Sequence, residues 1–233
     1  MKQILRLLAA ILIFSLLIAC AALAANAAPG GPLRLSSELP PDFFNEDCDG
    51  GADCPGRIFS DMPSAGHWAH LPIDWALTRH ITAGTGNGRF SPGAGCTRAQ
   101  AVTFLWRAAG SPAPQSQSCP FRDVAATAYY RSAVLWAYEN GVTSGTGSGC
   151  FSPNKVCTRA QIITFLWHAK GEPQASGAAM PFRDVSENAY YRIPVAWAVA
   201  NGVTGGTGSG TFSPNRTCTR AQIVTFLYKA YRS

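Results

Sequence analysis

Apolar residues recur along the chain in a pattern that predicts short helices. The stretch 129–140 predicts one such helix, because it carries apolar side chains at Val134, Trp136, Ala137 and Tyr138. An Asn-Gly pair ends this helix at Gly141 and its counterpart at Gly202, since glycine suits the left-handed cap of a helix. The corresponding place after Trp75 carries Arg79 and His80, which is a poorer stop signal.

A second kind of helix is apolar on almost every side. Its body is Ile162–Trp167, and this pattern predicts a helix in the interior of the protein. Thr158 and Gln161 precede it as a capping box, in which each side chain pairs with a backbone N–H group at the helix start. The same pair of residue types begins two further predicted helices, at Thr97 with Gln100 and at Thr219 with Gln222.

A glycine-rich stretch, Gly145–Gly149, connects the two kinds of helix and is followed by Phe151-Ser-Pro153. The spacing matches neither glycine-rich phosphate-binding motif, and no strand–helix–strand context precedes it. These residues are typical of a tight turn.

The whole pattern is repeated three times, as tryptophans 61 residues apart show at Trp75, Trp136 and Trp197. The repeats occupy residues 58–110, 120–171 and 181–233, and Pro/Gly/Ser/Gln/Ala-rich connectors join them. Each repeat is too short to bury a core of its own. We therefore predict an all-α monomer in which three helix-loop-helix repeats pack about a pseudo-threefold axis as one domain.

The N-terminus has the features of an export signal. Lys2 and Arg6 precede an apolar run, and the sequence Ala25-Asn26-Ala27 suits a signal peptidase, so residues 1–27 are predicted to be a signal peptide. In an alternative interpretation, the sequence before Cys20 resembles a bacterial lipobox, and Cys20 would be lipidated. Only that alternative brings the protein into contact with a membrane; both predict a secreted protein.

Charge changes along the chain. Removal of Lys2 and Arg6 from 19 basic residues leaves 17 against 13 acidic ones, a net charge of +4. Residues 28–57 are predicted to be an acidic linker, because six of the acids precede Arg57, at Glu38, Asp42, Glu46, Asp47, Asp49 and Asp53. The repeats are therefore basic, which favours an anionic partner. Nucleic acid is not expected, because the chain has no Lys/Arg runs and is exported.

The repeated motifs F-x-D, G-T-G-x-G-x-F-S-P and C-T-R-A-Q resemble those of the S-layer homology (SLH) module. That family writes its helix-start motif I-T-R-A-E, so glutamine here replaces glutamate and cysteine replaces isoleucine. The resemblance implies a noncatalytic protein that is anchored noncovalently at the bacterial cell surface. Its partner would be an anionic, often pyruvylated, secondary cell-wall polysaccharide. A lipid-anchored envelope tether and a wall-glycan-processing enzyme or its accessory factor are the alternatives.

An arginine begins each second helix, where the helix dipole disfavours a cation by about 0.3–1 kcal/mol. These arginines are Arg98, Arg159 and Arg220. One interpretation is an ion pair with an aspartate of the F-x-D motif, at Asp61, Asp123 or Asp184. The other is an anion site, because helix N-termini offer free N–H groups and a guanidinium adds a bidentate contact. Both can hold if the aspartate orients the arginine.

The resemblance places glycan-binding grooves between the repeats, with these arginines among the contacts. Aromatic residues beside the grooves would stack on sugar rings or pack at the rim, at Trp68, Tyr129 and Tyr190. The turn glycines Gly84, Gly145 and Gly206 complete the candidate ligand-binding residues.

No metal or cofactor is predicted. His67 and His70 near Asp74 are interpreted as solvated helix residues, and Asn45-x-Asp47-x-Asp49-Gly50 lacks the final glutamate of a calcium loop. No catalytic motif stands out.

The cysteines form two groups. Three are equivalent between repeats and are expected to be buried free thiols, at Cys96, Cys157 and Cys218. Cys119 and Cys150 occur only in the second repeat, which suggests a disulfide, although Cys150–Cys157 is an alternative. Cys48 and Cys54 would close a small disulfide loop, which an exported protein permits.

Overall fold

The computed structural model describes residues 48–175 and 180–232, all of which belong to the second of two units into which the chain divides after residue 40. The predicted signal peptide, Cys20 and Asp47 lie outside these residues. The described part is helical and contains only isolated β-bridges, which confirms the all-α prediction. Its elements are η1 (Pro55–Ile58), α2 (His70–Thr78), α3 (Arg98–Ala108), α4 (Arg131–Glu139), α5 (Arg159–Ala169), α6 (Arg192–Ala200) and α7 (Arg220–Tyr231).

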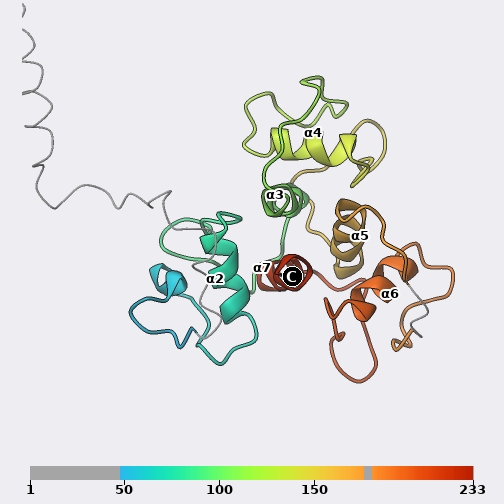
Figure 1. Ribbon diagram of the computed structural model, residues 1–233. Coiled ribbons are helices and arrows are strands. Elements are labelled where there is room, and N and C mark those ends of the chain that lie inside the picture. Colours follow the sequence, from blue (N-terminus) through green and yellow to red (C-terminus); the bar gives the residue numbers. More distant parts are fainter. Residues whose placement is uncertain (1–47, 176–179, 233) are drawn as a thin grey trace, which may run out of the picture. The chain divides into compact units, whose positions relative to one another are not determined.

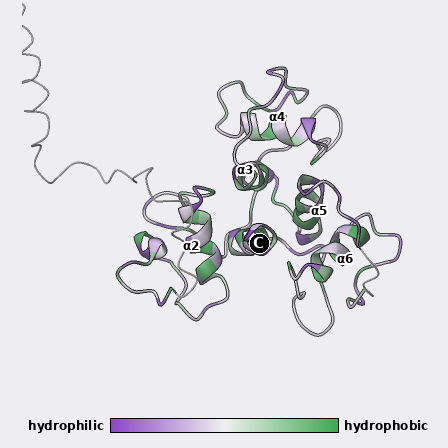
Figure 2. Cartoon of the chain, in the orientation of Figure 1, coloured by the Kyte–Doolittle hydropathy of each residue, from purple (hydrophilic) through white to green (hydrophobic). Residues whose placement is uncertain are grey.

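Figure 1 shows how the two kinds of helix are arranged. The second helices of the repeats, α3, α5 and α7, pack on one another in the middle, and the first helices, α2, α4 and α6, surround them. Figure 2 shows hydrophobic residues on all six of these helices. The arrangement confirms the pseudo-threefold packing that the repeats predict.

Each outer helix packs on a central helix from a different repeat. Helix α4 packs on α3, α6 packs on α5, and α2 packs on α7 at the far end of the chain. In the last pair, the rings of Trp75 and Tyr228 lie 5.8 Å apart in an edge-on contact. Each repeat therefore completes its core with a helix of its neighbour.

A ring of three backbone hydrogen bonds joins the repeats at the start of the central helices. The N–H of Cys96 donates to the carbonyl of Cys218, that of Cys157 to Cys96, and that of Cys218 to Cys157, each over 2.9 Å. The three thiols are fully buried and free, as the sequence predicts. Burial raises the pKa of Cys96 to about 12 and that of Cys157 to about 11.

The central helices begin with the predicted capping boxes. In α5 the N–H of Gln161 donates to Thr158 Oγ1 over 3.3 Å, and the N–H of Thr158 donates to Gln161 Oε1 over 3.0 Å. The next repeat supplies acceptors for the remaining N–H groups of the first turn: Arg159 N–H donates to the Arg216 carbonyl and Ala160 N–H to the Pro214 carbonyl. The helix start is therefore saturated with hydrogen bonds.

The outer helices end, and the turns fold, as the glycine pattern predicts. Gly141 and Gly202 adopt φ values of 67° and 66° after α4 and α6, and His80 adopts 55° at the equivalent place after α2. Gly145 has a φ of 91°, and a Cβ atom there would lie 2.5 Å from the Cys150 carbonyl oxygen. Only glycine satisfies both conditions without strain.

Residues 48–57, at the end of the predicted linker, fold against the first repeat. They lead into η1 (Pro55–Ile58), which packs on α2. Among the described helices, none has the length and apolar character needed to cross a membrane.

Candidate functional site between the repeats

Arg98 reaches from α3 into the second repeat. Its Nε donates to the Phe151 carbonyl over 2.8 Å, and its Nη2 donates to Thr143 Oγ1 over 3.1 Å. The guanidinium carbon lies 4.9 Å and 5.1 Å from the ring centroids of Phe151 and Phe165, within the range of cation–π attraction. Arg98 is thus an inter-repeat contact as well as a candidate for ligand binding.

The other two arginines repeat this geometry around the pseudo-threefold axis. Arg159 Nε donates to the Phe212 carbonyl over 2.9 Å, and Arg220 Nε donates to the Phe90 carbonyl over 2.8 Å. The exposed fractions are 3% for Arg98, 2% for Arg159 and 2% for Arg220. Burial disfavours the charged form and lowers the pKa of each guanidinium.

The aspartates of the F-x-D motif do not pair with these arginines in the structure. Both carboxylate oxygens of Asp123 accept backbone N–H groups, from Phe151 over 2.8 Å and from Ser152 over 2.7 Å. Asp61 and Asp184 hold the equivalent loops in the same way. Asp61 does form an ion pair with Arg89, over 3.4 Å. The expected arginine–aspartate ion pair is therefore replaced by a carboxylate that fixes the loop carrying the arginine's carbonyl acceptor.

Arg159 differs from its two equivalents in one atom. Its Nη2 is buried and has no hydrogen-bond partner among the described residues, whereas the Nη2 of Arg98 and of Arg220 each donate to a threonine. A buried donor without an acceptor costs about 1–3 kcal/mol, and more if it is charged. Arg159 therefore keeps one buried guanidinium donor that no described residue accepts.

Two cavities lie beside these arginines. One, of about 430 Å³, is lined by Arg159 from the second repeat, by the 203–207 loop and Phe226 from the third, and by Trp68 from the first. The other, of about 450 Å³, is lined by Arg98, the 141–145 loop, Phe165 and Tyr190. Three repeats thus contribute to each cavity.

The family model of the S-layer homology domain matches residues 58–102, 120–163 and 181–224, which together make up more than half of the chain. The chain belongs to the S-layer homology family. The inter-repeat cavities are therefore features of an SLH domain. Each of the three matched segments contains one of the arginines, at Arg98, Arg159 and Arg220.

Relatives with similar sequences include both S-layer proteins and proteins named as enzymes. An S-layer protein of Bacillus thuringiensis subsp. finitimus is 28% identical over 176 residues, which are 75% of this chain and 21% of that protein. An endoglucanase of Bacillus sp. (strain KSM-635) is 34% identical over 117 residues, 50% of this chain and 12% of the endoglucanase. An uncharacterized cell wall amidase of Bacillus anthracis is 28% identical over 173 residues, 73% and 31% of the two chains. The SLH chain thus spans less than a third of each of these relatives.

The three candidate aromatic residues of the SLH domain are exposed. The exposed fractions are 55% for Trp68, 67% for Tyr129 and 64% for Tyr190. Trp68 lines the Arg159 cavity and Tyr190 the Arg98 cavity. Burial raises the pKa of the Tyr129 hydroxyl, and the charges of Arg107 and Arg220 act against this rise.

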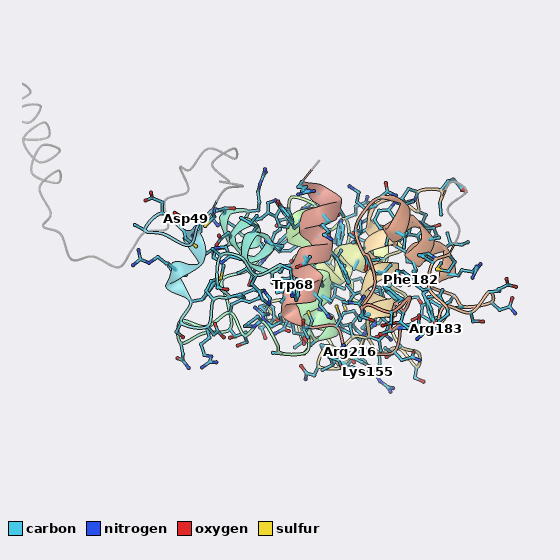
Figure 3. The ribbon with its side chains drawn as sticks, turned by 90° about the horizontal axis from the view of Figure 1, so that it is seen from below. Asp49, Trp68, Lys155, Phe182, Arg183 and Arg216 are labelled. Carbon is cyan, nitrogen blue, oxygen red and sulfur yellow. The ribbon has the colours of Figure 1, made fainter. Side chains whose placement is uncertain are left out.

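Positive charge is concentrated at the Arg159 cavity. Arg216 and Lys229 also line it, both are exposed, and no carboxylate lines it. Figure 3 shows Arg216 and Lys155, which are equivalent in the second and third SLH repeats, on the same side of the domain. Sequence reasoning missed Arg216 and Lys229, although both positions carry basic residues in another repeat, at Lys155 and at Arg107.

The turn glycines have a structural role that is independent of any ligand. Gly145 and Gly206 line the two cavities, but each also has a φ near 90° and lies against a phenylalanine ring and a backbone carbonyl. Gly84 has the same surroundings in the first SLH repeat. Their conformation accounts for the choice of glycine at all three positions.

The two expected disulfides, Cys119–Cys150 and Cys48–Cys54, are absent from the structure, in which all four cysteines are free thiols. Cys119 Sγ faces the carbonyl of Phe121 over 3.6 Å, and Cys150 Sγ faces that of Ser148 over 3.7 Å. Cys48 and Cys54 face His70 instead, over 3.4 Å and 3.5 Å. The interpretation of His70 as a solvated residue is wrong, because its exposed fraction is 2%.

The predicted weakness of the calcium motif remains a prediction. Asn45 and Asp47 lie outside the described residues, and the Asp49 carboxylate accepts the N–H of Gly51 over 2.8 Å.

Proposed function

We propose that this SLH domain anchors its protein noncovalently to the bacterial cell wall by binding an anionic secondary cell-wall polysaccharide in the Arg159 cavity. The observation that carries the proposal is the cavity itself, which places Arg159, with its unpaired Nη2, beside the exposed Arg216 and Lys229 and is lined by no carboxylate. The family match and the S-layer relatives support a role at the cell surface.

A carboxylate on the polysaccharide would complete the hydrogen bonding of Arg159. Pyruvylated sugars carry such a carboxylate, and an ionised acceptor forms a stronger hydrogen bond with guanidinium than a neutral one does. Arg216 and Lys229 add positive charge at the cavity, and the exposed ring of Trp68 offers a face for a sugar. The cavity thus combines the three contacts that an anionic glycan needs: a buried donor, a positive rim and an aromatic surface.

The Arg98 cavity is the weaker candidate of the two. Its arginine already donates to Phe151 and Thr143, and uncharged polar side chains and His168 supply its remaining polar groups. We infer that it binds an adjacent, neutral part of the same polymer, which would strengthen attachment through multivalency.

We propose a binding role without catalysis for the domain. Neither cavity is lined by an aspartate or a glutamate, whereas glycoside hydrolysis commonly uses a pair of carboxylates. The relatives named endoglucanase and amylopullulanase match this chain over 12% and 9% of their own length.

The test is retention of the purified protein on wall sacculi, before and after chemical removal of the secondary polymer. We expect retention on intact sacculi only. Trp68→Ala should weaken binding about tenfold, a change of about 1.4 kcal/mol, which is within the range of one aromatic contact. Arg216→Gln combined with Lys229→Gln should weaken binding further and reduce the salt dependence of the binding that remains.

Arg183→Gln is the matched control, because Arg183 is exposed and lines neither cavity. All variants should keep the melting temperature of the parent protein, since the substituted side chains are exposed. Equal retention of the Trp68 and Arg183 variants would contradict the proposal, as would retention that survives removal of the polymer.

A further inference from the structure

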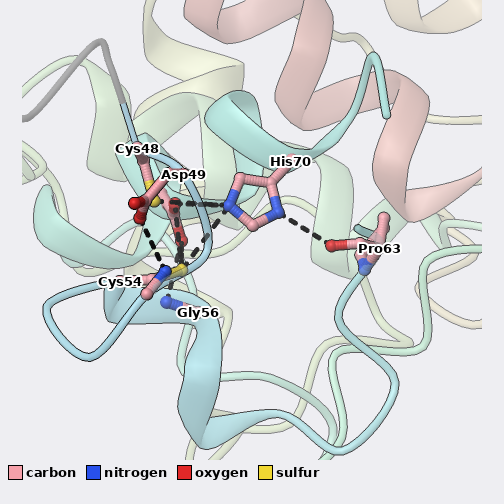
Figure 4. Close-up of polar contacts among 8 residues, drawn as sticks. Cys48, Asp49, Cys54, Gly56, Pro63 and His70 are labelled. Carbon is pink, nitrogen blue, oxygen red and sulfur yellow. Dashed lines mark hydrogen bonds and ion pairs between the residues drawn. The ribbon is translucent and has the colours of Figure 1, made fainter. Parts of the chain in front are cut away.

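A cluster of four potential metal ligands lies where segment 48–57 meets α2 (Figure 4). Cys48 and Cys54 come from the segment, and His70 and Asp74 come from the first two turns of the helix. The four ligand atoms all lie within 4.8 Å of one another. This cluster is separate from the glycan cavities, which none of its residues line.

The distances between the ligand atoms fit the edges of a tetrahedron around zinc. Zinc–sulfur bonds of about 2.3 Å and zinc–nitrogen bonds of about 2.05 Å imply sulfur–nitrogen edges of about 3.6 Å and nitrogen–oxygen edges of about 3.3 Å. His70 Nε2 lies 3.4 Å from Cys48 Sγ and 3.5 Å from Cys54 Sγ. Asp74 Oδ2 lies 3.3 Å from His70 Nε2 and 3.5 Å from Cys54 Sγ. The four groups therefore need little movement to bind one ion.

Backbone groups orient the two helix residues for this role. His70 Nδ1 lies 2.7 Å from the Pro63 carbonyl, to which it donates as N–H, so that the lone pair of Nε2 faces the sulfurs. The N–H of Gly56 donates to Asp74 Oδ1 over 2.7 Å, which leaves Oδ2 toward the centre of the cluster. In metal sites, a ligating histidine typically donates its other ring N–H to a carbonyl or carboxylate, and a ligating carboxylate typically accepts a further hydrogen bond.

The other repeats show that the fold itself does not require these residues. The position of Asp74 is occupied by Leu135 in α4 and by Ala196 in α6, so a buried carboxylate replaces apolar side chains. Asp74 is only 1% exposed, and its one ion-pair partner among the described residues is His70. An isolated carboxylate is costly to bury unless it is paired or coordinates a metal.

We propose that Cys48, Cys54, His70 and Asp74 form a structural zinc site. Two thiolates and an imidazole favour zinc over calcium or magnesium, which prefer oxygen ligands. Four protein ligands complete the coordination, which is the arrangement of structural rather than catalytic zinc. The ion would fasten segment 48–57 to the first helix of the first repeat.

The test is a metal titration of the full chain after complete reduction of its thiols in oxygen-free buffer. Co²⁺ alone should give thiolate-to-metal charge-transfer absorption and the visible bands of four-coordinate cobalt, with saturation at one equivalent. Zn²⁺ should displace it one for one and raise the melting temperature. Because the thiols are reduced first, a Cys48–Cys54 disulfide in the isolated protein does not affect the titration.

Cys54→Ser and Asp74→Asn should each weaken zinc binding by more than about 100-fold, since outer-shell changes alone cost about 10–100-fold. Cys48→Ser gives a further variant at a half-buried position, should either of the buried substitutions prevent folding. Cys150→Ser is the matched control, because its thiol is half-buried and lies outside the cluster. Absence of charge-transfer absorption in the reduced protein, or equal zinc affinity in Cys48→Ser and Cys150→Ser, would overturn the proposal.

Discussion

Arg98 and Arg159 occupy equivalent buried positions but differ in the number of hydrogen bonds that their guanidinium groups make. Arg98 donates through both Nε and Nη2, whereas Arg159 donates through Nε alone. Both stack between two phenylalanine rings. Arg98 therefore makes one more hydrogen bond to the rest of the fold than Arg159 does.

We expect Arg98→Ala to lower the free energy of unfolding by about 3 kcal/mol, since hydrogen bonds to charged groups contribute about 1.5–3 kcal/mol each. Arg159→Ala should cost at least about 1 kcal/mol less, because it removes one such bond and an unpaired donor. Binding to sacculi should show the reverse order, with the larger specific loss in Arg159→Ala. Urea unfolding and sacculus retention on both variants provide the check, and equal destabilisation of the two would contradict it.

The loop aspartates predict how stability depends on pH. Burial raises the pKa of Asp123, but hydrogen bonds from the N–H groups of Phe151 and Ser152 outweigh it, so that the pKa lies below its ordinary value. Asp61 behaves in the same way. Because the folded-state pKa is lowered, the carboxylates stabilise the fold above the unfolded-state pKa of about 3.9, and this contribution is lost as the pH falls through the folded-state value.

The free energy of unfolding should accordingly decrease as the pH falls below about 4, and Asp123→Asn should flatten that part of the curve. Denaturant unfolding from pH 6 to pH 2 measures both effects. A variant that retains the full acid dependence would show that other carboxyl groups are responsible.

At the scale of the element, each outer helix depends on a partner from another repeat. Helix α2, near the beginning of the described residues, packs on α7 at their end. Loss of α7 would uncover Trp75, which contacts Tyr228 and has an exposed fraction of 4%. The consequences of a C-terminal deletion should therefore appear in the first repeat.

We expect deletion of residues 181–233 to remove cooperative unfolding rather than to leave two stable repeats. Hydrogen exchange should show loss of protection in 70–78, although these residues lie far from the deletion in sequence. Protection in 131–139 should be lost less completely, because α4 keeps its partner α3. A truncated protein that melts cooperatively near the parent temperature would contradict this expectation.

The sequence predicts the local features of these elements better than their partners. The capping box joins residues three apart, and Gly141 follows its helix directly, so both are visible in a short window of sequence. The surroundings of Arg98 are not, because its acceptors Phe151 and Thr143 lie 53 and 45 residues away. The helix dipole alone therefore predicts free backbone N–H groups at the start of each central helix. In the structure, the next repeat supplies carbonyl acceptors for these groups. The same limit applies to His70 and Asp74, whose cysteine neighbours lie up to 22 residues earlier.

At the scale of the whole domain, the backbone groups of the three equivalent cysteines form the ring of hydrogen bonds that joins the repeats. Burial raises the pKa of each thiol, which reduces the reactive thiolate form. Cys96, Cys157 and Cys218 should therefore react with an alkylating reagent only after unfolding, while Cys119 and Cys150 react in the native protein. Mass spectrometry of the labelled peptides measures this, and native labelling of Cys157 at the rate of Cys150 would contradict it.

The hydrogen bond from Cys96 to Cys218 closes the ring of repeats on itself. An open stack of repeats can grow by one unit at a time, because its last unit always offers a free face to the next. Here α2 already covers the face of α7, so a fourth repeat would find no vacant surface. The number of inter-repeat cavities per domain is consequently fixed. If these cavities bind a wall polymer as proposed, a protein of this kind could bind a long polymer more tightly only by adding complete domains or by assembling several chains along it.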